Sequence, residues 1–94
     1  MNTSIKKQFL SVTFKWSGAS KVDELSPVFD KAIDWLRYAP NCWILWTSSS
    51  PQKWLERIKP HLGDGDHVFI VSVNIKERAG WLPKSTWEWL DKPR

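Results

Sequence analysis

The stretch His67-Val-Phe-Ile-Val-Ser-Val-Asn-Ile75 constrains the fold more than any other part of the chain. Its apolar residues alternate along one side as far as Ile75, and Val68 and Ile70 fill the other side as well. Polar residues take over that other side from Ser72 onward. A strand buried on both faces at its start belongs in the middle of a sheet, with helices over at least one face. The sequence therefore predicts a sheet with this stretch at its centre.

Two further stretches are typical of strands, and three of helices. Phe9 to Trp16 alternates between apolar and polar residues, and Cys42 to Thr47 is a strand-length run with little alternation. Apolar residues spaced three and four apart predict a helix that begins near Val22. Serine at the N-cap and proline at the first helical position predict a second helix from Ser50-Pro51. A last short helix is predicted from Pro83 to about Leu90.

The segment Trp35–Ala39 has two interpretations. The helical spacing of apolar residues continues to Leu36, so the first helix could run to Arg37 before Pro40 stops it. Alternatively, 35–39 is a strand, and the turn dipeptide Pro40-Asn41 joins it in a hairpin to the stretch from Cys42. The residues alone leave both open.

Ninety-four residues leave room for one domain, 1–94, with an ordered core of about 8–90 and frayed residues at Lys92-Pro93-Arg94. The order is strand, helix, one or two strands, helix, strand and a short tail. This order fits an open, mainly antiparallel sheet with two helices on one face and a short C-terminal helical tail. The predicted fold class is therefore α+β, and specifically ferredoxin-like.

The net charge of +4 is unevenly distributed, because all the early charges are positive. These cations could contact a nucleic-acid backbone, although an excess this mild is more often ordinary surface. A single cysteine excludes an internal disulfide, and neither a signal peptide nor a membrane-spanning run is present in the sequence, so we expect a cytoplasmic protein without membrane contact. The candidate nucleic-acid contacts are Lys6, Lys7, Lys15 and Lys21.

Eight tryptophans are unusual for a chain of this length. Large rings allow a small domain to build a core from few residues, and they are also enriched at interfaces. We expect about half of these rings in the core, with Trp81, Trp87 or Trp89 at an edge or interface. A small domain also gains from burying more surface in a homodimer. The candidate interface residues are Trp81, Leu82, Trp87 and Trp89.

One polar cluster could carry chemistry. Asp64, Asp66 and His67, with His61 nearby, could bind a divalent cation that activates water for hydrolysis. Glycine and aspartate are equally the usual residues of a helix-to-strand turn, which is the favoured interpretation. No motif indicates a cofactor, a small-molecule substrate or a catalytic nucleophile.

Several motifs together resemble the small CRISPR-associated integration-subunit ("Cas-two") family, and especially its uncharacterised relatives outside CRISPR loci. The residues that carry the resemblance cover nearly the whole chain: Val12-Thr-Phe14, Cys42-Trp-Ile-Leu-Trp-Thr47, Trp54-Leu-Glu-Arg-Ile-Lys-Pro-His-Leu62, Asp64-Gly-Asp-His-Val-Phe-Ile-Val71, Ala79-Gly-Trp-Leu-Pro83 and Trp87-Glu-Trp-Leu90.

The resemblance implies a ferredoxin-like protomer that forms a homodimer, in which C-terminal segments often complete the partner's sheet. It also favours a strand over 35–39. Metal-dependent nucleases of that family carry an Asp just after the aromatic residue that ends the first strand, whereas Lys15 follows Phe14 here. The resemblance therefore does not carry nuclease activity over. The leading hypothesis is a non-catalytic homodimer that acts through protein contact or binding of a nucleic-acid backbone. The alternative is a metal-dependent nuclease using Asp64, Asp66 and His67.

Overall fold

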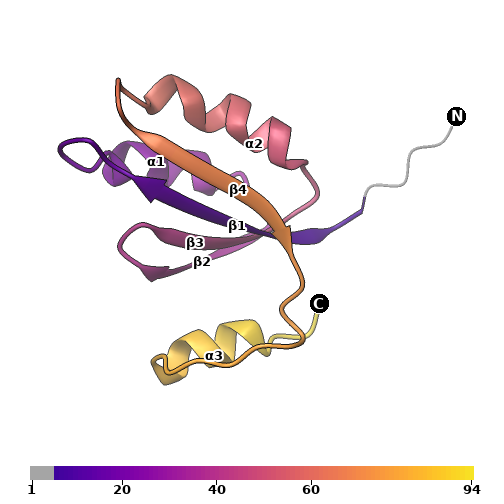
Figure 1. The fold of residues 1–94 in the computed structure, drawn as a ribbon. Coiled ribbons are helices and arrows are strands. Elements are labelled where there is room, and N and C mark those ends of the chain that lie inside the picture. Colours follow the sequence, from indigo (N-terminus) through magenta and orange to yellow (C-terminus); the bar gives the residue numbers. More distant parts are fainter. Residues whose placement is uncertain (1–5) are drawn as a thin grey trace, which may run out of the picture.

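In the computed structural model, which describes residues 6–94, a four-stranded sheet carries helices on both faces (Figure 1). The sheet order is β2-β3-β1-β4, and every neighbouring pair of strands is antiparallel. The prediction of an α+β chain with an open antiparallel sheet is confirmed. The elements are β1 (Gln8–Lys15), α1 (Val22–Phe29), β2 (Asp34–Ala39), β3 (Cys42–Thr47), α2 (Pro51–Ile58), a 3-10 turn (Lys59–His61), β4 (His67–Val73) and α3 (Lys84–Leu90).

The predicted position of the stretch from His67 is wrong. β4 lies at an edge of the sheet and pairs only with β1, which is itself central between β3 and β4. None of its residues is fully buried, and Phe69 keeps 67% of its surface exposed. Val68 and Ile70 do pack against the core, so the apolar residues of one side were interpreted correctly. The other side points away from α1 and α2, where little covers it.

The segment at 35–39 is a strand, as the resemblance suggested. α1 ends at Phe29, and β2 forms a hairpin with β3 through Pro40-Asn41. In this arrangement Trp35 packs near Phe29, with ring centroids 6.5 Å apart. The helical spacing does not decide the structure here, because pairing with β3 gives hydrogen-bond partners to backbone groups of β2. In this strand Trp35 still packs against the core.

The first face of the sheet, toward α1 and α2, holds the hydrophobic core. Alternate residues of β1 and β3 point into it, and both helices add their apolar sides. Ser50 caps α2 as predicted, since its hydroxyl accepts a hydrogen bond from Lys53 N–H at 3.1 Å. The core consists of Leu10, Val12, Phe14, Leu25, Val28, Phe29, Trp43, Leu45, Trp54 and Ile58.

The second face points the opposite way, toward α3 (Figure 1). The chain leaves β4, crosses beneath this face and returns as α3. Strand register places its side chains in three rows across the sheet, so residues from distant parts of the chain become neighbours. The rows are Asp34, Trp46, Phe9 and Val73; then Leu36, Ile44, Ser11 and Val71; then Cys42, Thr13 and Phe69.

Residues after α3, which the sequence predicts to fray, make contacts with the sheet. Lys92 Nζ lies 3.1 Å and Arg94 Nη1 3.3 Å from Asp34 Oδ2 on β2. Arg94 also donates to the carbonyl of Trp89 at 3.1 Å. A charged tail is ordinarily expected to fray, and its sequence does not reveal that Asp34 and several aromatic rings lie within its reach.

Candidate functional site

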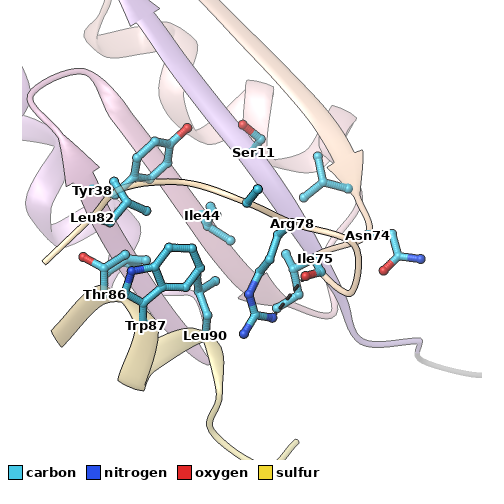
Figure 2. A pocket seen from close by; sticks show the side chains of 13 residues that line it. Ser11, Tyr38, Ile44, Asn74, Ile75, Arg78, Leu82, Thr86, Trp87 and Leu90 are labelled. Carbon is cyan, nitrogen blue, oxygen red and sulfur yellow. Dashed lines mark hydrogen bonds between the residues drawn. The ribbon is translucent and has the colours of Figure 1, made fainter. Parts of the chain in front are cut away.

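A cavity of about 260 Å³ lies between the second face and the segment that carries α3 (Figure 2). The middle row of the face forms one wall, and the stretch from Asn74 to Leu90 forms the other. Most of the lining is aliphatic or aromatic. The residues around it are Ser11, Leu36, Tyr38, Ile44, Val73, Asn74, Ile75, Arg78, Ala79, Leu82, Thr86, Trp87 and Leu90.

Among the described residues that line this cavity, the one ionised side chain is already paired. The guanidinium of Arg78 pairs with the carboxylate of Asp91 and donates to the carbonyl of Ile75 at 3.1 Å. It also lies 5.8 Å from the ring centroid of Trp87. Arg78 thus closes the cavity wall with little net charge, because Asp91 offsets it.

Tyr38 brings a hydroxyl to the same cavity. Burial raises its pKa, and the neighbouring thiol of Cys42 raises it further, although the hydroxyl of Ser11 acts in the opposite direction. Tyr38 is therefore neutral at physiological pH and can donate or accept a hydrogen bond. Cys42 is half-buried beside it.

A second arrangement, the aromatic box, surrounds Arg94 at the first row of the second face. Phe9 and Trp46 are cross-strand neighbours with ring centroids 4.5 Å apart, and Trp89 of α3 closes the box. The guanidinium carbon of Arg94 lies 4.3 Å from the ring centroid of Trp89 and 5.6 and 5.7 Å from those of Phe9 and Trp46. Cation–π attraction and the ion pair with Asp34 together fasten α3 to the sheet.

The surroundings of Asp34 lower the pKa of its carboxyl group. Burial alone would raise its pKa, but hydrogen bonds from Lys92 and the backbone N–H of Trp35, with the charge of Lys92, outweigh it and lower the pKa. The indole of Trp89 also lowers the pKa, although its N–H meets no acceptor in hydrogen-bond geometry. Asp34 is therefore ionised at neutral pH.

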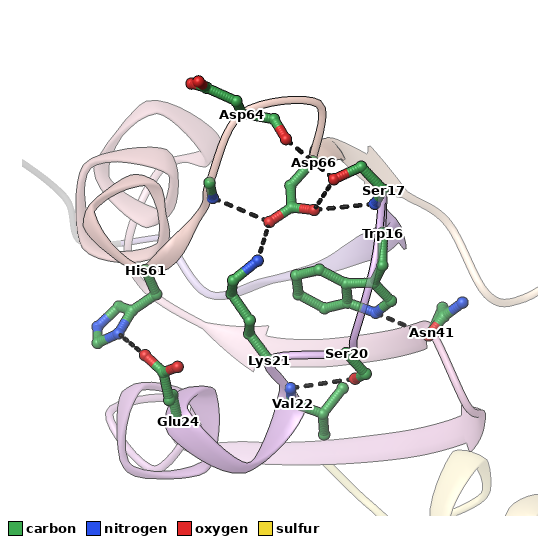
Figure 3. A network of polar contacts seen from close by, with 11 residues as sticks. Trp16, Ser17, Ser20, Lys21, Val22, Glu24, Asn41, His61, Asp64 and Asp66 are labelled. Carbon is green, nitrogen blue, oxygen red and sulfur yellow. Dashed lines mark hydrogen bonds and ion pairs between the residues drawn. The ribbon is translucent and has the colours of Figure 1, made fainter.

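The polar cluster around Asp66 forms a structural turn, which is the favoured interpretation of its sequence (Figure 3). Asp66 accepts hydrogen bonds from the backbone N–H of Ser17 and of Gly63, both at 2.9 Å, and pairs with Lys21. The ion pair with Lys21 is the main cause that holds the pKa of Asp66 well below its usual range. Its side chain has no exposed surface. Gly65 permits the tight turn at φ +83, where a Cβ would lie 2.8 Å from that of Ser17.

The other members of the predicted cluster point elsewhere. Asp64 is exposed, and its backbone carbonyl accepts a hydrogen bond from the hydroxyl of Ser17 at 2.9 Å. His61 Nδ1 lies 3.5 Å from Glu24 Oε1 on α1, and His67 is exposed at the start of β4. Across residues 6–94, no three His, Cys, Asp or Glu side chains come together as a metal site would require.

The four predicted nucleic-acid lysines do not gather on one surface. Lys6 and Lys7 precede β1, and Lys15 ends it, so the strand's length of about 25 Å separates them. Lys21 is held by Asp66 at the far end from Lys6. Lys6 and Lys7 instead line a wide groove, about 680 Å³ in volume, with Lys76 and the rings of Phe9 and Trp46.

The candidate dimer residues occupy different environments. Trp81 is 100% exposed, whereas Leu82 and Trp87 are half-buried and line the cavity. Trp89 is 8% exposed inside the aromatic box, which leaves it little surface to offer a partner.

The sequence did not reveal the exposed apolar side chains of β4, Phe69 and Val71, or the cavity. Phe69 is 67% and Val71 37% exposed. Alternation in His67–Val73 separates them from Val68 and Ile70, but it does not say which side is covered. No sequence pattern predicts the cavity, because its shape depends on how the segment after β4 folds back across the sheet.

Comparison with models of protein families, with curated proteins and with solved structures gave no match. None of the helices in residues 6–94 has the length and apolar character needed to cross a membrane.

Proposed function

We propose that the chain is a non-catalytic, cytoplasmic homodimer of ferredoxin-like fold that acts through contact with other macromolecules. The order β-α-β-β-α-β, with both crossover helices on one face, supports the ferredoxin-like assignment. That fold agrees with the resemblance to the "Cas-two" family, which rests on the residues quoted above. The arrangement of Asp66 gives the nuclease alternative less support, because Lys21 and backbone donors already use its carboxylate.

The observation that carries the dimer proposal is the open apolar surface on β4, formed by Phe69 and Val71. Large apolar side chains this exposed favour an interaction surface. β4 is also an edge strand, so its outer backbone groups could pair with a second copy. Trp81 adds a fully exposed ring on the segment before α3, which is available to a partner.

Sedimentation equilibrium with a matched pair of variants tests this proposal. Phe69→Ser should weaken the dimer about tenfold or more, since an aromatic anchor is lost, while leaving the fold intact. Ile33→Ser is the control, because Ile33 is also exposed, at 54%, but lies in the loop before β2. A wild-type chain that is monomeric at micromolar concentration would refute the dimer, and equal weakening by both variants would move the interface away from β4.

A nucleic-acid backbone is the second candidate partner, because Lys6, Lys7 and Lys76 line one groove with two aromatic rings. Binding of a single-stranded oligonucleotide should then fall about tenfold or more between about 50 and 200 mM salt, and Lys6→Glu should weaken it. Lys31→Glu, on an exposed residue outside the groove, should not. Failure of this binding would leave contact with proteins as the proposed activity.

A further inference from the structure

The cavity beneath the second face is partly open to solvent, so a small molecule could enter it from outside. About 260 Å³ is enough for a molecule with one aromatic ring. Side chains of β1, β2, β3, α3 and the segment before α3 all contribute to the lining.

The two ends of the cavity differ in chemistry. Figure 2 shows the hydroxyls of Tyr38 and Ser11 at one end, with Trp87 and Leu90 at the other. Aliphatic Leu36 and Ile44 belong to the sheet wall that lines the space. An occupant should therefore have an apolar body and one end that can exchange a hydrogen bond.

The charge of the lining limits the occupant further. Arg78 is the only cationic side chain in the lining, and Asp91 and the carbonyl of Ile75 already engage it. A carboxylate ligand would have to compete with Asp91 for that guanidinium. Tyr38, with its raised pKa, stays neutral and provides no charge. An uncharged ligand is thus favoured over an anion or a cation.

We propose that this cavity binds a small uncharged molecule with one aromatic ring and a hydroxyl group, a simple phenol or aryl alcohol. The ring lies toward Trp87 and Leu90, and the hydroxyl exchanges hydrogen bonds with Tyr38 and Ser11. Phe69 does not line the cavity, so Phe69→Ser tests the dimer without altering the ligand's contacts.

The test titrates the full chain with 4-methylphenol, toluene and benzoate, followed by NMR of the tryptophan indole N–H groups. We expect 4-methylphenol to bind with a dissociation constant of about 1 mM or below, shifting Trp87 and leaving Trp54 in the opposite core unmoved. Toluene, which lacks the hydroxyl, should bind about threefold to tenfold more weakly. Benzoate should bind at least about tenfold more weakly, because it must lose its hydration without a cation to meet it.

Two variants and a control locate the binding. Tyr38→Phe should reduce the affinity for 4-methylphenol toward that for toluene, since only Ser11 remains as a partner, and leave the affinity for toluene unaffected. Ile44→Phe should fill the cavity and abolish both. Ile33→Phe makes the same chemical change at an exposed position outside the cavity and should bind as the wild type does.

Three results would overturn the proposal. No shift with any of the three probes up to their solubility would show that the cavity takes no such ligand. Shifts that spare Trp87, or binding that Tyr38→Phe and Ile44→Phe leave intact, would place the ligand elsewhere. Tyr38→Phe changes one atom, so it keeps the test decisive even if Ile44→Phe fails to fold.

Discussion

The two faces of the sheet are covered in different ways. On the first face, two eight-residue helices pack closely, and Phe29 lies 4.8 Å from Trp43 and 6.3 Å from Trp54, measured between ring centroids. On the second face a single seven-residue helix covers one side of the sheet, leaving a cavity in the middle and Phe69 exposed at the edge.

This difference separates stability from binding. Close packing of rings on the first face buries apolar surface, and such burial is the main source of folding free energy. The cover of the second face is fastened to the sheet by the ion pairs of Lys92 and Arg94 with Asp34 and by the aromatic box. The ion pair of Arg78 with Asp91 joins two parts of the cover itself. A cover held at a few points can open locally, as binding regions commonly do.

Leu45 and Ile44 are adjacent on β3, and their side chains point to opposite faces of the sheet. Substituting each of them by alanine should give the largest difference between the two faces. Leu45 is fully buried in the first face, so Leu45→Ala should lower the free energy of unfolding by about 3 kcal/mol or more. Ile44 is half-buried beside the cavity, and Ile44→Ala should cost about 1 kcal/mol, since part of its surface is already uncovered. Urea denaturation followed by circular dichroism measures both. Equal losses would show that the two faces are packed alike.

Asp66 should give the next largest effect, because it ties the loop before α1 to the turn before β4. In Asp66→Asn the ion pair with Lys21 is lost, and one of the acceptors for Ser17 and Gly63 becomes a donor. The thermal midpoint should fall clearly, by less than for Leu45→Ala. Asp64→Asn is the matched control at an exposed position and should leave the midpoint almost unchanged.

The same substitution should also alter the dependence of stability on pH. Because Lys21 and the backbone donors depress the pKa of Asp66 in the folded chain, its stabilisation is complete above the unfolded pKa, about 3.9. It is lost as the pH falls through the folded value. The difference in midpoint between wild type and Asp66→Asn should thus be constant above about pH 5 and shrink below about pH 4. A difference that does not depend on pH would assign the effect to geometry alone.

The first face could largely be predicted from sequence, and the second could not. Alternation from Leu10 to Phe14 and helical spacing around Trp54 each name a buried side, because the period fixes which residues point together. Ser50 before Pro51 likewise fixes a helix start from neighbouring residues alone. These are local signals, and they held.

What failed depends on contacts between distant residues. His67–Val73 has the composition of a central strand, but its place at the edge is set by which strand pairs with β1. Arg94 belongs to a tail without periodicity, and only the register of three strands brings Phe9, Trp46 and Asp34 into the row that receives it. The turn at Asp66 was anticipated, whereas its partner Lys21 was assigned to nucleic acid because the sequence does not show what lies opposite a lysine.

Replacing Arg94 should have the smallest effect on global stability, but it should show most directly how α3 is held on the second face. Arg94→Ala removes the cation from the aromatic box and one of two partners of Asp34, which should free α3 without unfolding the sheet. We expect amide hydrogen exchange in α3 to become about fivefold faster, the equivalent of about 1 kcal/mol, while β1 and β3 stay protected. Lys92→Ala is the matched control: it removes the other cation at Asp34, but its half-exposed side chain touches no ring of the box, so exchange in α3 should change less. If Arg94→Ala accelerates exchange in β1 and β3 as much as in α3, the cover and the core unfold together. The two faces would then form one cooperative unit.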